Sequence, residues 1–80
     1  MNFVYDDIEI ENYEKIRLIL CDNLGSPKTE EINHCIEALK FIGSNGSLNV
    51  RYYKTNKLMF QGNLGLDNIL KEIKEKVGIN

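Results

Sequence analysis

Hydrophobic residues repeat with the period of an α-helix in three parts of the chain. The spacing predicts helices over residues 12–24, 27–37 and 66–77, each with one apolar stripe on an otherwise polar surface. Asn12 is placed to cap the first of these helices, and Gly25 to end it. The three stripes consist of Ile16, Ile19, Leu20 and Leu24; of Ile32, Cys35, Ile36 and Leu39; and of Leu66, Ile69, Leu70, Ile73 and Val77.

The other helix boundaries have signals of their own. Ser26 followed by Pro27 is typical of a helix start, because Ser caps and Pro suits the first helical position. The run 39–42 has the character of a strand, so the second helix is expected to give way to a strand near residue 38. Gly78 closes the last helix.

Alternating apolar and polar residues predict three strands, over residues 3–10, 48–54 and 57–61. Asp6 and Asp7 interrupt the first alternation, so a bulge or a break is expected there. The period of two implies that each strand has one face on a core and one face toward solvent.

Short turns are predicted between the later strands. The segment 44–47 contains Asn45 and Gly46, the pair that favours a type I′ hairpin turn because both residues tolerate positive φ. Thr55 and Asn56 are expected to form a second tight turn. The elements therefore read strand, helix, helix or extended crossover, strand, strand, strand, helix. This order predicts an α+β fold in one domain, 1–80, with an antiparallel sheet of about four strands and helices packed on one face.

Composition and charge limit the classes of function that the chain could have. The 80 residues are 42% hydrophobic and 28% charged, with a net charge of −2, as in ordinary soluble domains. Residues 1–37 carry nine acidic and three basic side chains, whereas residues 38–65 carry four basic and no acidic ones. This asymmetry is either chance or the mark of a basic surface. No apolar run is long enough for a membrane span, and the first residues do not resemble a signal peptide, so a cytoplasmic protein without membrane contact is expected.

Few residues in the sequence suggest cofactor or catalytic chemistry. Cys21 and Cys35 are expected to be free thiols, and with His34 they do not make the paired spacings of a zinc site. Asp6 and Asp7 are adjacent, so in a strand they would point to opposite faces and could not act as an acid–base pair. No cofactor is expected, and the chain is interpreted as a non-catalytic protein.

One stretch of the sequence resembles a known family. It runs Leu48-Asn-Val-Arg-Tyr-Tyr-Lys-Thr-Asn-Lys-Leu-Met-Phe-Gln-Gly62 and is followed by a helix. It is similar to the strand–(S/T)-G-K–strand–G–helix pattern of TATA-binding-protein-like folds, found also in the N-terminal substrate-binding domain of ribonuclease HIII and in the repeated N-terminal domains of RNase LS-type toxins. Asn56 stands where the family has Gly. The resemblance covers 48–77 and implies one TATA-binding-protein-like half whose open sheet binds nucleic acid.

The strand alternation itself places a basic, amide-bearing and aromatic set of side chains on the open face or its rim. Such groups suit phosphate contact and base stacking. Taken together with the resemblance, these groups lead us to expect RNA or an RNA–DNA duplex as the ligand. The alternative is a protein-interaction module, such as an inhibitor or a toxin–antitoxin-associated domain, because Tyr, Met and Arg are also enriched in protein interfaces. The predicted site residues are Lys40, Asn49, Arg51, Tyr53, Lys54, Lys57, Met59 and Gln61.

Overall fold

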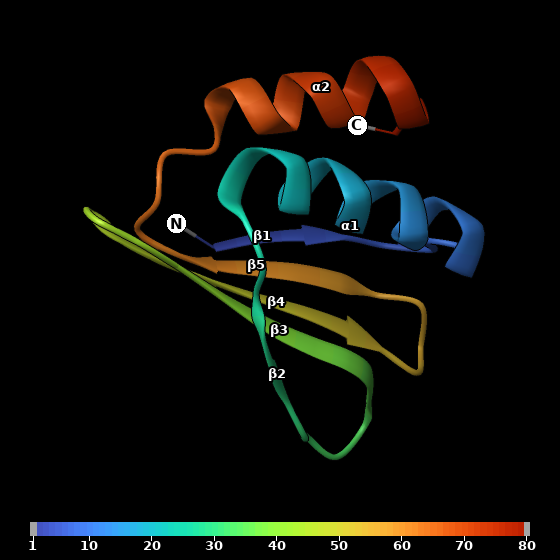
Figure 1. The fold of residues 1–80 in the computed structure, drawn as a ribbon. Helices are drawn as coiled ribbons and strands as arrows, with labels where there is room; N and C mark the ends of the chain where they lie inside the picture. The colour runs from blue at the N-terminus through green and yellow to red at the C-terminus, as the bar shows by residue number, and fades with distance from the viewer. Residues whose placement is uncertain (1, 80) are drawn as a thin grey trace.

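A computed structural model describes residues 2–79 and shows one antiparallel sheet with two helices on the same face (Figure 1). Met1 and Asn80, which the prediction of one domain over 1–80 includes, lie outside the described residues. The elements are β1 (Asn2–Tyr5), α1 (Ile10–Leu24), β2 (Lys28–Glu30), β3 (Cys35–Gly43), β4 (Gly46–Tyr53), β5 (Leu58–Gly62) and α2 (Asp67–Val77).

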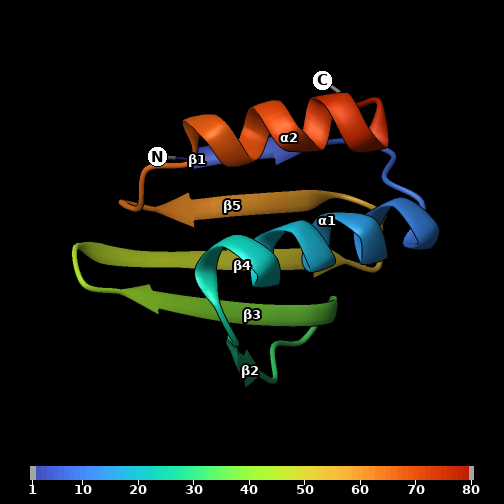
Figure 2. The ribbon, with the colours of Figure 1, turned by 45° about the horizontal axis from the view of Figure 1, so that its top comes forward.

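The sheet has five strands in the order β1-β5-β4-β3-β2, and every neighbouring pair is antiparallel. The expected α+β class with an antiparallel sheet is thus confirmed, and the fifth strand is β2. In Figure 2, α1 lies over the middle of the sheet and α2 lies over its β1 side, which leaves the opposite face of the sheet open.

Burial along β4 follows the predicted alternation. Leu48, Val50 and Tyr52 are at most 1% exposed and face the helices, whereas the residues between them are only half-buried. Leu58 and Phe60 of β5 are fully buried in the same core. Apolar side chains on one face of each strand therefore set the orientation of the whole sheet.

The N-terminal strand is shorter than predicted. It ends at Tyr5, and Asp7, with φ of 56°, turns the chain away from the sheet at the expected break. Ile8 is buried outside the sheet, and α1 begins at Ile10 after an extended Glu9. The N-cap assignment to Asn12 is therefore wrong, because the helix has already begun two residues earlier. Gly25 ends α1 as expected, and its N–H donates to the Cys21 carbonyl.

The helix predicted over 27–37 is not formed. The exposed strand β2 and a turn at His34, whose φ is 73°, occupy this segment, and β3 starts at Cys35. Pairing with β4 along the length of β3 buries Ala38 and Leu39. This long-range burial outweighs a helical spacing of apolar residues that would have left most of them on a short surface helix.

The two later turns differ in how well they were predicted. Gly43 pairs with Gly46, so Ser44 and Asn45 form the turn, and Asn45 does not adopt positive φ. The type I′ turn centred one residue later is therefore wrong, although the hairpin is present. The tight turn expected at Thr55 and Asn56 is confirmed, and Asn56 adopts a left-handed φ of 67° in it.

The C-terminal helix is close to its prediction. α2 ends at Gly78, which has φ of 80° and donates its N–H to the Lys74 carbonyl. Ile69 and Ile73 are buried, whereas Leu70 is only partly buried at the margin of the core. No helix in the described part of the chain is long and apolar enough to cross a membrane.

Candidate nucleic-acid interface

Strand register aligns polar side chains in a row across the open face. Lys28 of β2 pairs with Lys40 of β3, which pairs with Asn49 of β4, which pairs with Gln61 of β5. Directly opposite residues in antiparallel strands point to the same face. The fold therefore brings together three of the predicted site residues, and it adds Lys28 to them.

Arg51 lies in the next row, between Ala38 on β3 and Met59 on β5. It is half-buried at the centre of the open face, and its Nε is buried without a hydrogen-bond partner among the described residues. A guanidinium is always charged and carries five donors in a planar fork. A buried N–H left unpaired costs stability, so an acceptor from a ligand would be favoured at this position.

Three more predicted residues gather at one end of the β4–β5 hairpin. Tyr53 is half-buried on the open face, and its N–H donates to the Lys57 carbonyl at 2.8 Å. Lys54 is exposed in the turn. Lys57 lies 3.8 Å from Asp6, and both side chains are more than half exposed, so this ion pair contributes little.

The charge of the open face is mostly uncompensated. Lys28, Lys40 and Arg51 form no ion pair with any residue from 2 to 79, and neither does Lys54 in the turn at one end of the sheet. Glu30, opposite Ala38 on the edge strand β2, is the acid that shares these rows. The result is a cationic surface on a protein whose net charge is −2.

The helical layer carries acidic side chains together with basic ones, such as Lys15 on α1 and Lys71 on α2. Glu11, Glu14 and Asp22 are exposed on α1, which packs on the other face of the sheet. The charge of the helical layer is therefore mixed, whereas the open face of the sheet is mainly basic. A basic open face would attract a polyanion to that side of the sheet.

A second polar cluster lies on the helix side of the sheet. Tyr13 stacks on Tyr52 with ring centroids 4.2 Å apart, and its hydroxyl donates to Glu37. Arg17 also donates to Glu37, at 3.0 and 3.1 Å. Burial and the bond to Glu37 raise the pKa of Tyr13, and the bond to Glu37 raises the pKa of Arg17. The cluster joins α1 to β3. Because its polar groups are hydrogen-bonded to one another, it offers no free reactive group.

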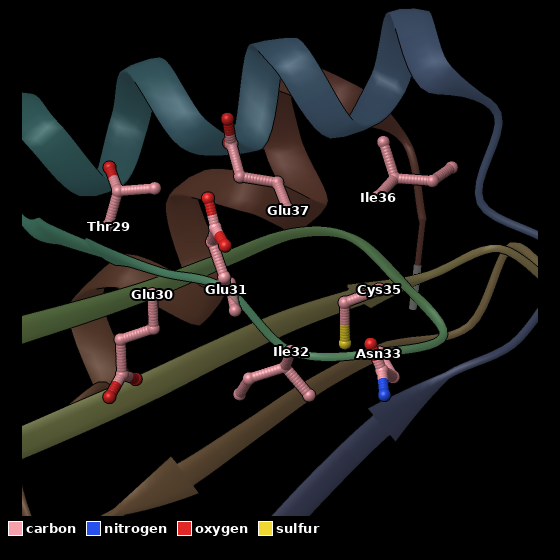
Figure 3. Close-up of a pocket in the computed structure, with 9 residues that line it drawn as sticks. Thr29, Glu30, Glu31, Ile32, Asn33, Cys35, Ile36 and Glu37 are labelled. Atoms are coloured by element: carbon pink, nitrogen blue, oxygen red, sulfur yellow. The ribbon is translucent and has the colours of Figure 1, made fainter.

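A pocket of about 270 Å³ opens between β2 and the start of β3 (Figure 3). Glu31 and Glu37 point toward the helical layer, whereas Glu30 and Cys35 point to the other side of the strands. The three carboxylates therefore do not converge. Within residues 2–79, no three His, Cys, Asp or Glu side chains are grouped closely enough to hold a metal ion. Cys21 and Cys35 are both free thiols.

Alternation along the strands was enough to place the open-face residues of β4 and β5. Lys28 is not among the predicted site residues, because the spacing predicts a helix over its segment, and only its pairing with Lys40 brings it to the open face. Nothing in the sequence around Lys28 indicates that its side chain lies on the open face of the sheet. Comparison of the chain with family models, with curated proteins and with solved structures found no match.

Proposed function

We propose that the open face of the sheet binds nucleic acid, as RNA or an RNA–DNA duplex, without catalysing a reaction. The observation that carries this proposal is Arg51, whose buried Nε lacks a partner among residues 2–79 at the centre of a cationic face. A phosphate oxygen is an acceptor of the required charge, and Arg binds it with two parallel hydrogen bonds.

The neighbouring side chains add further groups that suit a nucleic acid. Lys28 and Lys40 lie side by side one row from Arg51 and would contact further phosphates of the same strand. Tyr53 offers a ring for stacking on a base, and the amide of Gln61 can both donate and accept hydrogen bonds at base or sugar edges. The resemblance of 48–77 to the substrate-binding domain of ribonuclease HIII supports RNA–DNA duplex as the first ligand to try.

The experiment is a titration of fluorescently labelled single-stranded RNA, single-stranded DNA and RNA–DNA duplex, followed by anisotropy at several salt concentrations. With about four phosphate contacts, the logarithm of affinity should fall against the logarithm of salt with a slope of about −3 to −4. Arg51→Gln should weaken binding and reduce the magnitude of this slope by about one. Lys15→Gln, an exposed lysine on α1, is the matched control. Absence of binding by the unaltered protein to all three probes at low salt would exclude the proposal.

One observation favours a protein ligand for the same face instead. Val4 and Ile42 are 52% and 58% exposed and lie on the open-face side of β1 and β3. Exposed aliphatic side chains suit a protein interface more than a phosphate backbone. Binding to one protein that tolerates high salt, together with no nucleic-acid binding, would establish this alternative.

A further inference from the structure

The two edges of the sheet are protected very differently. β2 is three residues long, follows Pro27, and carries the exposed charges of Lys28 and Glu30. These features discourage pairing with another strand. β1, at the other edge, has no charged residue and no proline, and Val4 within it is 52% exposed. An edge strand with a row of unpaired backbone groups and no such protection is a template for a further strand.

An apolar groove runs beside this unprotected edge. It lies between β1 and α2, which Figure 2 shows next to each other, and has a volume of about 360 Å³. Phe3, Tyr5, Leu70 and Ile79 contribute its apolar lining. The groove would receive a side chain that an added strand directs to the helical side of the sheet.

Two lysines give the groove a charge preference. Lys71 and Lys74 line it from α2, about one helical turn apart. Neither forms an ion pair within the described part of the chain, whereas Lys76 is paired with Glu72 at 2.8 Å. A segment that combines an apolar side chain with carboxylates two positions away would therefore match both the groove and its rim.

We propose that β1 binds an extended segment of another protein by strand addition, with an apolar side chain in the groove and carboxylates facing Lys71 and Lys74. Backbone hydrogen bonds would supply affinity, and the side chains that alternate toward the groove would supply specificity. This site lies on the helical side of the β1 edge, away from Arg51, so it does not depend on the nucleic-acid proposal.

A second copy of the chain fits the same edge less well. In a symmetric pair joined through β1, each protomer presents the same surface to the other. Lys71 and Lys74 of both protomers would then lie along one seam. Since like charges across an interface are unfavourable, the groove favours an acidic partner over a copy of itself.

The probe is the blocked heptapeptide Gly-Asp-Val-Leu-Val-Asp-Gly, labelled with fluorescein and titrated by anisotropy. Leu and both Asp would point to the groove side, and the two Val would lie on the side of Val4. A peptide with Lys in place of both Asp should bind at least about tenfold more weakly. Two more peptides are N-methylated, one on Leu and one on the Val after it. Because neighbouring N–H groups point to opposite edges of a strand, only one of these changes should cause a loss of about tenfold.

Variants of the protein test the contacts from the other side. Lys74→Glu should weaken binding by about fivefold or more, and Lys15→Glu on α1 should leave it unchanged. Val4→Lys should block the edge, and a thermal melt checks that it folds. No anisotropy change up to about 1 mM peptide would overturn the proposal, since affinity would be weaker than that of a specific site. Equal binding of both N-methylated peptides would also overturn it, as would a dimer in light scattering that Val4→Lys abolishes.

Discussion

The Tyr13 hydroxyl donates a 2.5 Å hydrogen bond to Oε1 of Glu37, across 24 positions of the chain. Arg17, one turn further along α1, donates to both carboxylate oxygens of Glu37. Register in β3 shifts between Cys35 and Glu37, so the carboxylate is held just after a bulge. The bulge turns Glu37 to the helical side, and the two donors from α1 then fix the helix at that end of the strand.

Glu37→Gln should destabilise the protein by about 1–3 kcal/mol, because it removes a charged acceptor from a partly buried network. Tyr13→Phe should have a similar effect, and the double variant should cost less than the sum of the two, since both remove the same bond. Urea unfolding of the four proteins measures this coupling. Glu14→Gln, an exposed glutamate on the same helix, is the control, and an equal effect of Glu14→Gln would contradict the prediction.

Stability should fall at alkaline pH. Burial, reinforced by Glu37, raises the pKa of Tyr13 above 10.0, and burial also raises the pKa values of Tyr5 and Tyr52. The folded protein therefore keeps protons that the unfolded chain loses, so the stability from these groups is complete below pH about 10 and decreases above it. Tyr13→Phe should flatten the decrease by up to about 1.4 kcal/mol per pH unit. Urea unfolding between pH 9 and about 11 measures the free energy of unfolding of the unaltered protein and of Tyr13→Phe. If this free energy fell with pH equally steeply in both proteins, the prediction would be contradicted.

Ile73 and Leu70 of α2 should respond differently to truncation. Ile73 is 0% exposed, so Ile73→Ala leaves a cavity and should cost about 2–5 kcal/mol. Leu70 is partly buried beside the β1 groove, so Leu70→Ala should cost less than Ile73→Ala. Thermal melts of the two variants rank them directly. If Leu70→Ala were the more damaging, α2 would be rotated relative to the arrangement described above.

Tyr52 and Tyr53 test the two faces of β4. Tyr52 is 0% exposed, stacks on Tyr13, and donates its hydroxyl to the Ile8 carbonyl at 2.6 Å. Tyr52→Ala should therefore cost about 3–5 kcal/mol, a large part of the stability of a small domain. Tyr53→Ala should alter the melting temperature far less and should weaken nucleic-acid binding. Greater destabilisation by Tyr53→Ala would show that the faces are inverted.

Gly62 and Gly65 offer a matched pair of glycine substitutions. Gly62 has φ of 155°, and a Cβ there would lie 2.2 Å from the Ser47 carbonyl oxygen on the neighbouring strand. Gly62→Ala should thus cost more than about 1 kcal/mol, because two backbones would have to separate. At Gly65 a Cβ would meet nothing within 4 Å, so Gly65→Ala should be tolerated. Chemical denaturation distinguishes the two, and equal effects would contradict the close approach at Gly62.

Strand alternation predicted more of this molecule than helical spacing did. The alternation of Leu48, Val50 and Tyr52 predicted the buried face of β4, because a period of two is preserved in a strand that has no bulge of its own. Ile32, Cys35, Ile36 and Leu39 have the spacing of a helical stripe, but they belong to a turn, a bulge and a strand. A bulge changes the phase of alternation, and pairing with a distant strand has no local signature, so the sequence could not reveal either.

The candidate site was predictable on β3, β4 and β5, the three strands joined by short turns. Arg51, Met59 and Gln61 follow from the alternation of β4 and β5. The position of Lys28 depends on β2 pairing with β3, and the apolar groove beside β1 depends on how α2 lies over the sheet. Both are products of tertiary packing, which intrinsic propensities do not specify.

The place of β1 next to β5 has a consequence for synthesis on the ribosome. Asn2–Tyr5 are synthesised before their pairing partners, Leu58–Gln61, which leave the exit tunnel more than fifty residues later. The β3–β4 hairpin closes across Ser44 and Asn45 alone, so its loop entropy is small and it can form first. β1 then remains an unpaired, uncharged segment of the nascent chain. Until β5 has been synthesised, β1 stays exposed. During this time the nascent chain is most susceptible to mispairing or to binding by a chaperone.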